Sequence, residues 1–114
     1  MAIEYTATQR NARISPRKVR LSADLIRGKT VEQALTTLEF DTRRGSYVLR
    51  KVLQSAVANA QSRGGLDPLD LTVTKCSIDE GFTLKRWKPC GRGRIHSIKK
   101  RCSHINVVVS AVEE

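Results

Sequence analysis

Eight cationic side chains are gathered in one acid-free part of the sequence, between Gly81 and Val112. They are Lys85, Arg86, Lys88, Arg92, Arg94, Lys99, Lys100 and Arg101. Such groups suit the phosphates of a polyanion, and Arg can grip one phosphate through two parallel hydrogen bonds. The whole chain carries 21 Lys and Arg against 11 Asp and Glu, so outside this stretch 13 basic residues face 11 acidic ones. The net charge of +10 is therefore concentrated, and it indicates nucleic-acid binding.

A second basic group surrounds the first predicted helix. Its members are Arg10, Arg13, Arg17, Lys18, Arg20, Arg27 and Lys29. Taken alone, such a group is most often a solvated helix face. Beside the acid-free stretch, it predicts one continuous basic surface.

Other chemistries find little support. Cys76, Cys90 and Cys102 contain no Cys-x-x-Cys pair, and structural zinc sites usually draw their ligands from such close pairs. We therefore expect reduced thiols, no metal and no cofactor. His96 and His104 both lie among cations, and no nucleophile–base grouping, phosphate loop or carboxylate pair is present. The sequence predicts that the protein is not an enzyme.

Three helices are predicted before residue 65. Ser15 and Pro16 suit an N-cap and first helical position, and Gly28 would end that helix. Thr30 and Gln33 form a capping box for a helix over Val31–Phe40. A third and longest helix, capped by Asp41 or Thr42, is expected to run to about Arg63 before Gly64-Gly65.

Three strands are expected around these helices. Residues 3–8 alternate between apolar and polar, as do residues 69–74, and a bulge or twist is expected past Lys75 because the apolar positions then shift to Cys76 and Ile78. The β-branched run Ile105–Val112 suits a central strand. The element order predicts an α+β fold, with three helices packed on a small three-stranded antiparallel sheet and a long protruding basic β-hairpin. Residues 1–114 form a single domain that includes this hairpin arm, residues 82–104.

The arm would turn at Pro89–Gly93, where Gly91 and Gly93 allow positive φ and a close approach of RNA. A disordered basic loop is the alternative to an ordered ribbon, but long structureless loops are uncommon inside compact domains. Trp87 could stack on an exposed base or anchor the ribbon to the domain, and both possibilities remain open.

We expect no signal peptide, since no basic segment is followed by an apolar run at the start of the sequence, and no apolar run is long enough to span a membrane. We expect a cytoplasmic protein with no membrane partner. A DNA-binding or RNA-chaperone module would be the alternative on charge alone. It is disfavoured because the sequence lacks a helix-turn-helix pattern and the aromatic runs of an RNA-recognition sheet.

Several motifs resemble those of one family over nearly the whole chain. They are residues 14–20 (ISPRKVR), 25–29 (LIRGK), 52–60 (VLQSAVANA), 79–81 (DEG), 84–86 (LKR), 91–94 (GRGR) and 100–109 (KRCSHINVVV). In order and spacing they resemble the bacterial-type large-subunit ribosomal protein L-twenty-two family, including its plastid-encoded forms. Phe82, Cys90 and Ile95-His96 depart from the family's usual residues, and the loss of an Asp there makes the tip more cationic.

The resemblance implies a structural protein of the large ribosomal subunit that binds 23S-type rRNA and supports early assembly. It implies that the hairpin helps line the polypeptide exit tunnel, near the L-four protein and other large-subunit proteins and beside the nascent polypeptide. The location would be the cytoplasm, or the plastid stroma for a plastid-encoded chain. The implied rRNA-binding residues are Arg13, Ser15, Pro16, Arg17, Lys18, Lys29, Asn59, Lys85, Arg86, Arg101, Ser103 and His104. The implied tunnel-facing tip is Lys88, Pro89, Cys90, Gly91, Arg92, Gly93 and Arg94.

Overall fold

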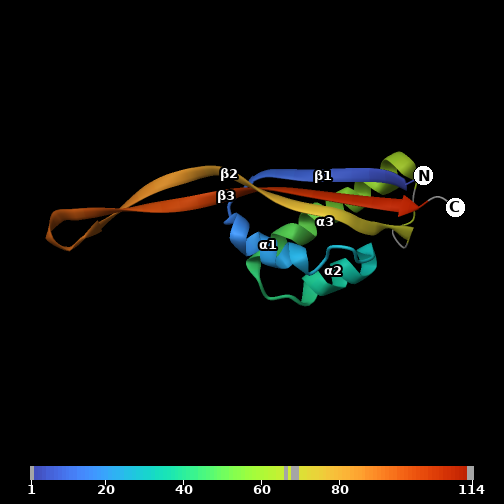
Figure 1. Cartoon of the computed structure of the whole chain (residues 1–114), viewed down its shortest axis with the longest axis horizontal. Coiled ribbons are helices and arrows are strands. Elements are labelled where there is room, and N and C mark those ends of the chain that lie inside the picture. Colours follow the sequence, from blue (N-terminus) through green and yellow to red (C-terminus); the bar gives the residue numbers. More distant parts are fainter. Residues whose placement is uncertain (1, 66, 68–69, 113–114) are drawn as a thin grey trace.

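The computed structural model describes residues 2–65, 67 and 70–112. In chain order its elements are β1 (Ala2–Ala12), α1 (Pro16–Asp24), α2 (Val31–Phe40), α3 (Arg44–Gly64), β2 (Thr72–Cys90), a short 3-10 turn (Gly91–Gly93) and β3 (Arg94–Val112). The helices lie along one face of the sheet, while the far ends of β2 and β3 extend away from them as a ribbon (Figure 1). This is the predicted α+β architecture with a protruding hairpin.

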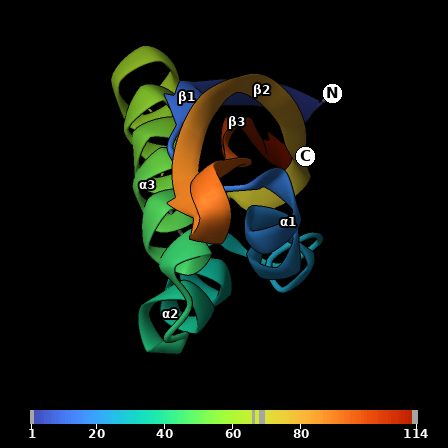
Figure 2. The same cartoon turned by 90° about the vertical axis from the view of Figure 1, so that its left-hand side faces the viewer.

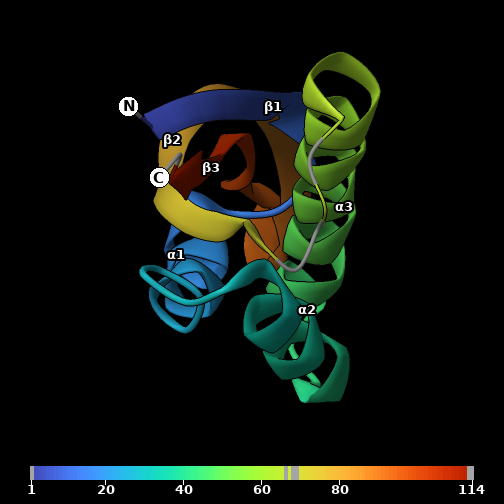
Figure 3. The same cartoon turned by 90° about the vertical axis from the view of Figure 1, so that its right-hand side faces the viewer.

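The sheet has the order β1-β3-β2, and both of its strand pairs are antiparallel. The central place of β3 is confirmed: Val109 pairs with Tyr5 of β1 and with Val73 of β2. Viewed end-on, α3 lies beside β1 and α1 lies below β2 (Figures 2 and 3), and these element pairs are in contact. Because the β-branched residues of β3 have a strand on each side, they are shielded along both edges.

The core lies between the helices and the covered face of the sheet. From β3 it receives Ile105, Val107 and Val109, which alternate along the strand and are fully buried. From α3 it receives Leu49, Leu53, Ala56 and Ala60, which recur at helical spacing. Small residues on α3 let the helix approach the sheet closely, and one contiguous cluster results.

The bulge expected in β2 is confirmed. The pairing register shifts between Val73 and Lys75, so the buried positions change from Leu71 and Val73 to Cys76 and Ile78. One extra residue in one strand of an antiparallel pair produces this exchange of faces. The strand itself begins at Thr72, later than the alternation suggested, and Leu69 lies outside the described residues.

Two predicted helix boundaries are wrong. Helix α1 ends at Asp24 and not at Gly28, because the backbone of Gly28 and Lys29 instead hydrogen-bonds to Val73 of β2. Helix α3 has Arg43 as its N-cap, where Asp41 or Thr42 was expected. Asp41 still contributes at this end, since its carboxylate accepts hydrogen bonds from the Arg43 N–H and the Ser46 hydroxyl.

The other helix ends follow the prediction more closely. Ser15 is the N-cap of α1 with Pro16 at the first helical position, although its hydroxyl makes no capping bond. The Thr30 hydroxyl accepts a hydrogen bond from the Gln33 N–H, and α2 has the expected bounds. Helix α3 ends at Gly64, and Gly65 has a left-handed conformation with φ 62°.

The arm is a continuous two-stranded extension of the sheet. Pairing of β2 with β3 runs from the body to Cys90 and Arg94, with a register shift between Glu80 and Thr83. The ribbon makes the molecule long, 68 × 25 × 18 Å (Figure 1). At its tip Gly93 has a positive φ of 74° as expected, but the second such residue is Arg92 with φ 64° and not Gly91.

Candidate nucleic-acid interface

A cleft of about 540 Å³ lies where the arm leaves the body. It is lined by Arg13, Ile14, Ser15, Lys18, Arg44, Lys99, Lys100 and Arg101. Every charged side chain among these described lining residues is a cation. The cleft combines residues from the β1–α1 loop, α1, α3 and β3, so the two basic groups of the sequence meet here. We call this concavity the cationic cleft.

The β1–α1 loop is held against β3 by a buried hydrogen bond. The Ser103 hydroxyl donates to the Ile14 carbonyl at 2.6 Å, and Ser103 is fully buried. Ala12 pairs with Ser103 through the backbone, and the Ile14 N–H donates to the Ala12 carbonyl. Together these contacts fix the position from which Arg13 reaches the cleft.

The first turn of α1 forms one wall of the cleft. Ser15 and Lys18 line it, and this turn contains no acidic residue. The positive end of a helix dipole favours anions, so the backbone adds to the field of the cations. Pro16 is buried in the same turn, whereas Arg17 is exposed but is not among the lining residues.

Arg44 lines the cleft, although it is not among the rRNA-binding residues expected from the sequence. It opens α3 and is followed by Gly45, which packs against α1 so closely that a Cβ there would lie 3.1 Å from the Lys18 carbonyl oxygen. The missing side chain of Gly45 thus brings Arg44 to the cleft. The signal in the sequence was the cation pair Arg43-Arg44 directly before small residues at a helix start. Lys99 and Lys100 also line the cleft. Of these neighbouring cations, the resemblance implied only Arg101 as an rRNA-binding residue.

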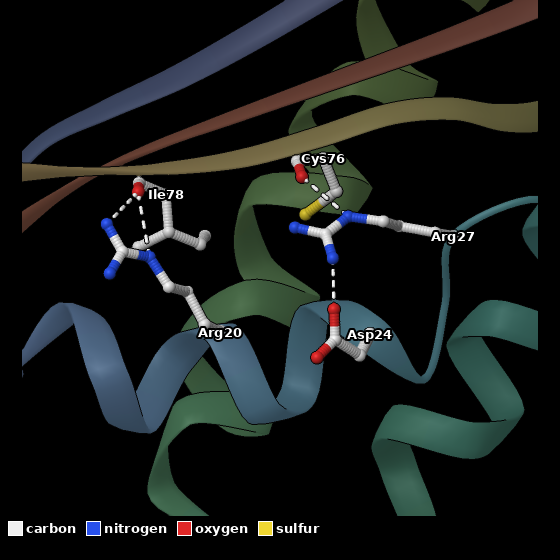
Figure 4. A network of polar contacts seen from close by, with 5 residues as sticks. All are labelled: Arg20, Asp24, Arg27, Cys76 and Ile78. Atoms are coloured by element: carbon white, nitrogen blue, oxygen red, sulfur yellow. Dashed lines mark hydrogen bonds and ion pairs between the residues drawn. The ribbon is translucent and has the colours of Figure 1, made fainter.

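Two cations of the second basic group serve the fold (Figure 4). Arg20 donates from Nε and an Nη atom to the Ile78 carbonyl, at 3.3 and 3.0 Å. Arg27 donates from Nε to the Cys76 carbonyl at 2.9 Å and pairs with Asp24. Since β2 is an edge strand in the body, these carbonyls face away from β3 and need other partners. Both arginines remain exposed, so each joins the fold through its N–H groups while its charge stays at the surface.

Besides Pro16, Arg17 and Ser103, three more predicted residues of the body do not line the cationic cleft. Lys29 is exposed beside α2, in a groove with Glu32 and Gln33. The Asn59 side chain donates to the Thr6 carbonyl at 3.0 Å and so ties α3 to β1. His104 accepts a hydrogen bond at Nδ1 from the Asn11 N–H.

His104 belongs to the sheet face that the helices leave open. A groove there is lined by Thr8, Arg10, Asn11, Asp79, His104 and Asn106. Asn106 connects all three strands, because it accepts from the Thr8 hydroxyl and donates to the Asp79 carboxylate. Both signs of charge occur in this groove, which makes it less suited to a polyanion than the cationic cleft.

The arm carries its cations in the open. Lys85 and Arg86 are exposed, and Arg86 donates to the Lys85 carbonyl at 2.9 Å. The Trp87 side chain is 68% exposed, so the interpretation that it anchors the ribbon to the domain is wrong. At the tip, Lys88, Pro89, Gly91, Arg92 and Gly93 are exposed. The side chains of Cys90 and Arg94 lie outside the described part of the chain.

The cysteines that can be described are buried free thiols, Cys76 and Cys102. Burial raises the pKa of the Cys76 thiol to about 11, which keeps it protonated and unreactive at neutral pH. Among the described residues, no three His, Cys, Asp or Glu side chains are grouped closely enough to hold a metal ion. None of the described helices is long and apolar enough to cross a membrane.

A comparison with known protein families matches residues 7–110 to the family described as Ribosomal protein L22p/L17e. The matched region contains the cationic cleft, the arm and all three helices. It begins after the first residues of β1 and ends near the end of β3. The chain belongs to the ribosomal protein L22p/L17e family, the L-twenty-two family that its motifs resemble.

Proposed function

We propose that the chain binds 23S-type rRNA through the cationic cleft and the adjoining arm. Membership of the family makes the protein a structural constituent of the large ribosomal subunit, in a family of structural proteins and not of enzymes. What is proposed beyond this is where and how the RNA is held. The observation that carries the proposal is the cleft itself: six cations converge on it from four elements.

The six cations of the cleft repel one another and do not stabilise the folded chain by themselves. Like charges that are brought together destabilise a folded chain unless an anion lies between them. Phosphates supply that anion, and the forked side chains of Arg13, Arg44 and Arg101 match phosphate geometry. We infer that a strand of rRNA runs through the cleft with its backbone against these groups.

The predicted rRNA-binding residues contribute in different ways under this proposal. Arg13, Lys18 and Arg101 contact phosphate from the cleft, and Lys85 and Arg86 contact it from the arm. Ser103 and Pro16 are buried and act by holding the loop and α1 in place. Ser15 would contact rRNA within the cleft, and Arg17, Lys29, Asn59 and His104 would contact rRNA segments outside it.

The arm is proposed to thread between rRNA segments, with its tip in the polypeptide exit tunnel beside the nascent chain. Its strands pair along their full length but its side chains are largely exposed, which is the form of an element that RNA must surround. The L-four protein would be its neighbour, and early assembly would depend on the same contacts. We propose that the body and the arm, residues 82–104, form one domain. The protein would be bound to ribosomes in the cytoplasm or in a plastid stroma.

Reversal of a cleft charge tests the proposal. The variant Arg44→Glu places a carboxylate among the remaining five cations and should weaken binding to a 23S-type rRNA domain fragment by about tenfold or more. Arg63→Glu is the matched control, since Arg63 is exposed in the last turn of the same helix and does not line the cleft. Equal affinities of the two variants in a filter-binding titration would refute the placement of RNA in the cleft.

A further inference from the structure

The two faces of the arm differ in chemistry. Residues directly opposite each other in an antiparallel pair lie on the same face, and the register pairs Thr83 with Arg101, Lys85 with Lys99 and Trp87 with Ser97. We call the face formed by these six residues the lysine–tryptophan face. Of its members, Lys85, Trp87, Ser97, Lys99 and Arg101 are exposed.

The opposite face combines aliphatic side chains with cations. It pairs Leu84 with Lys100 and Arg86 with Ile98. Leu84 and Ile98 are diagonal neighbours there, and both are half-buried. Leu84 and Ile98 thus lie on one face of the ribbon, and the exposed ring of Trp87 lies on the other.

Lys85 and Lys99 are an unfavourable pair as they stand. Like charges directly opposite each other in an antiparallel pair destabilise it, and no acidic residue occurs between Gly81 and Val112 to relieve them. An external anion between the two ammonium groups would reverse the sign of this interaction. Lys99 also lines the cationic cleft, so a strand bound in the cleft can continue onto this face without leaving the cations.

Trp87 lies two residues beyond Lys85 on the same face. Its side chain is 68% exposed, and its cross-strand partner Ser97 is too small to cover the ring. A solvent-exposed indole on a ribbon offers a flat surface at the end of a row of cations. Cations that track a backbone, followed by an aromatic ring, are the arrangement with which proteins bind single-stranded nucleic acid.

We propose that the lysine–tryptophan face binds a single-stranded RNA segment, with phosphates on Lys85, Lys99 and Arg101 and one base stacked on Trp87. This proposal rests on the rRNA binding proposed above. It adds that the RNA bound by the arm is unpaired and has an accessible base. A duplex would leave the ring unused, because its bases are already stacked on each other.

Intrinsic fluorescence tests this directly, because Trp87 is the only tryptophan in the chain. The probes are a 12-nucleotide oligoadenylate and an abasic ribose-phosphate strand of the same length, which carries the same phosphates without bases. Oligoadenylate should quench the fluorescence of the full-length chain, and the abasic strand should leave it nearly unchanged. Equal quenching by both probes, or by neither, would overturn the stacked base. Quenching by an oligoglutamate peptide but not by oligoadenylate would also contradict the proposal, because it would indicate that the face binds an acidic polypeptide.

Variants measure the contribution to affinity. Trp87→Ser should weaken oligoadenylate binding by about tenfold, whereas Trp87→Phe, which keeps an aromatic face, should retain most of it. Phe82→Ser is the matched control, since Phe82 is an exposed aromatic of the same strand that lies within the register shift and outside the face. Unchanged affinity of Trp87→Ser would contradict the proposal. That result would leave the rRNA proposal standing if the wild-type chain still bound the rRNA fragment and Arg44→Glu still weakened this binding. The rRNA proposal itself would be refuted if the wild-type chain did not bind the fragment.

Discussion

Arginine residues around α1 have two different roles, which depend on whether the side chain donates to backbone carbonyls. Arg20 and Arg27 donate to carbonyls on the outer edge of β2, while Arg13 lines the cationic cleft. The backbone of Gly28 and Val31 covers the same edge nearer its start. An uncovered strand edge invites pairing with other chains, so these arginines protect the sheet as well as joining α1 to it.

Ser103 illustrates a polar residue whose role is structural in this chain. The variant Ser103→Ala removes the donor to the Ile14 carbonyl and leaves a buried acceptor without its partner. We expect a loss of about 1–3 kcal/mol in the free energy of unfolding, measured by urea denaturation. Ser77→Ala, at an exposed position of β2, is the control and should change stability by less than about 0.5 kcal/mol. If both variants had the wild-type stability, the buried hydrogen bond would not be holding the loop.

Cys76 predicts a pH dependence of stability. Burial raises the pKa of its thiol from 9.0 to about 11, so the folded chain keeps the proton that the unfolded chain releases. Its contribution is complete below pH 9 and is lost as the pH rises towards 11. Between pH 8 and pH 10 the wild type should lose about 1.4 kcal/mol more than Cys76→Val, measured in parallel urea titrations. Parallel pH profiles for the two proteins would contradict this.

At the scale of the elements, the sequence predicted most of what local patterns control. Helix α2, the exit from α3, the bulge after Val73 and the central position of β3 followed from capping residues, glycine and alternation. The end of α1 and the start of α3 could not be predicted in this way. The Gly28–Val73 hydrogen bonds and the Gly45–α1 contact that decide them join segments far apart in the sequence.

The candidate site was predictable to a similar extent. The acid-free stretch and the resemblance identified Arg13, Lys18 and Arg101, all of which line the cleft. Arg44 was missed because its place depends on the packing of α3 against α1. Ser103 was expected at the RNA, but its burial follows from pairing with Ala12, which no local pattern reveals.

The arm is expected to be dispensable for folding. The described core cluster contains no residue between Ile78 and Ile105, and the buried Cys102 and Ser103 lie at the base of the arm, outside residues 84–100. Replacing residues 84–100 with Asn-Gly would join Thr83 to Arg101 by a two-residue hairpin turn. We expect this shortened chain to unfold in one cooperative transition with nearly the wild-type stability.

Binding should respond differently from folding to this deletion. The shortened chain lacks Lys99 and Lys100 from the cleft and keeps only Arg101 among the cations of the arm, so its affinity for the rRNA fragment should fall steeply. A broad or absent unfolding transition, followed by circular dichroism, would contradict the separation of body and arm. Undiminished rRNA affinity would contradict the proposed role of the arm.

At the scale of the whole molecule, charge and shape agree. The long axis of 68 Å comes from the arm (Figure 1), and the cationic cleft lies where the arm meets the body. A bound RNA can therefore contact one compact surface and one extended surface at the same time. The net charge of +10 is what draws the two partners together over distance, whereas the cleft determines where the RNA is held.

The salt dependence of rRNA binding tests the central claim most directly. Six cleft cations that each neutralise one phosphate should contribute about −4 to −5 to the slope of log K against log KCl concentration for the wild-type chain, and the arm cations add to its magnitude. The variant Lys18→Ala, Arg44→Ala should reduce the magnitude of that slope by about 1–2, and Arg63→Ala should leave it unchanged. A slope near zero, or one that the cleft substitutions do not alter, would contradict the account that phosphates occupy the cationic cleft.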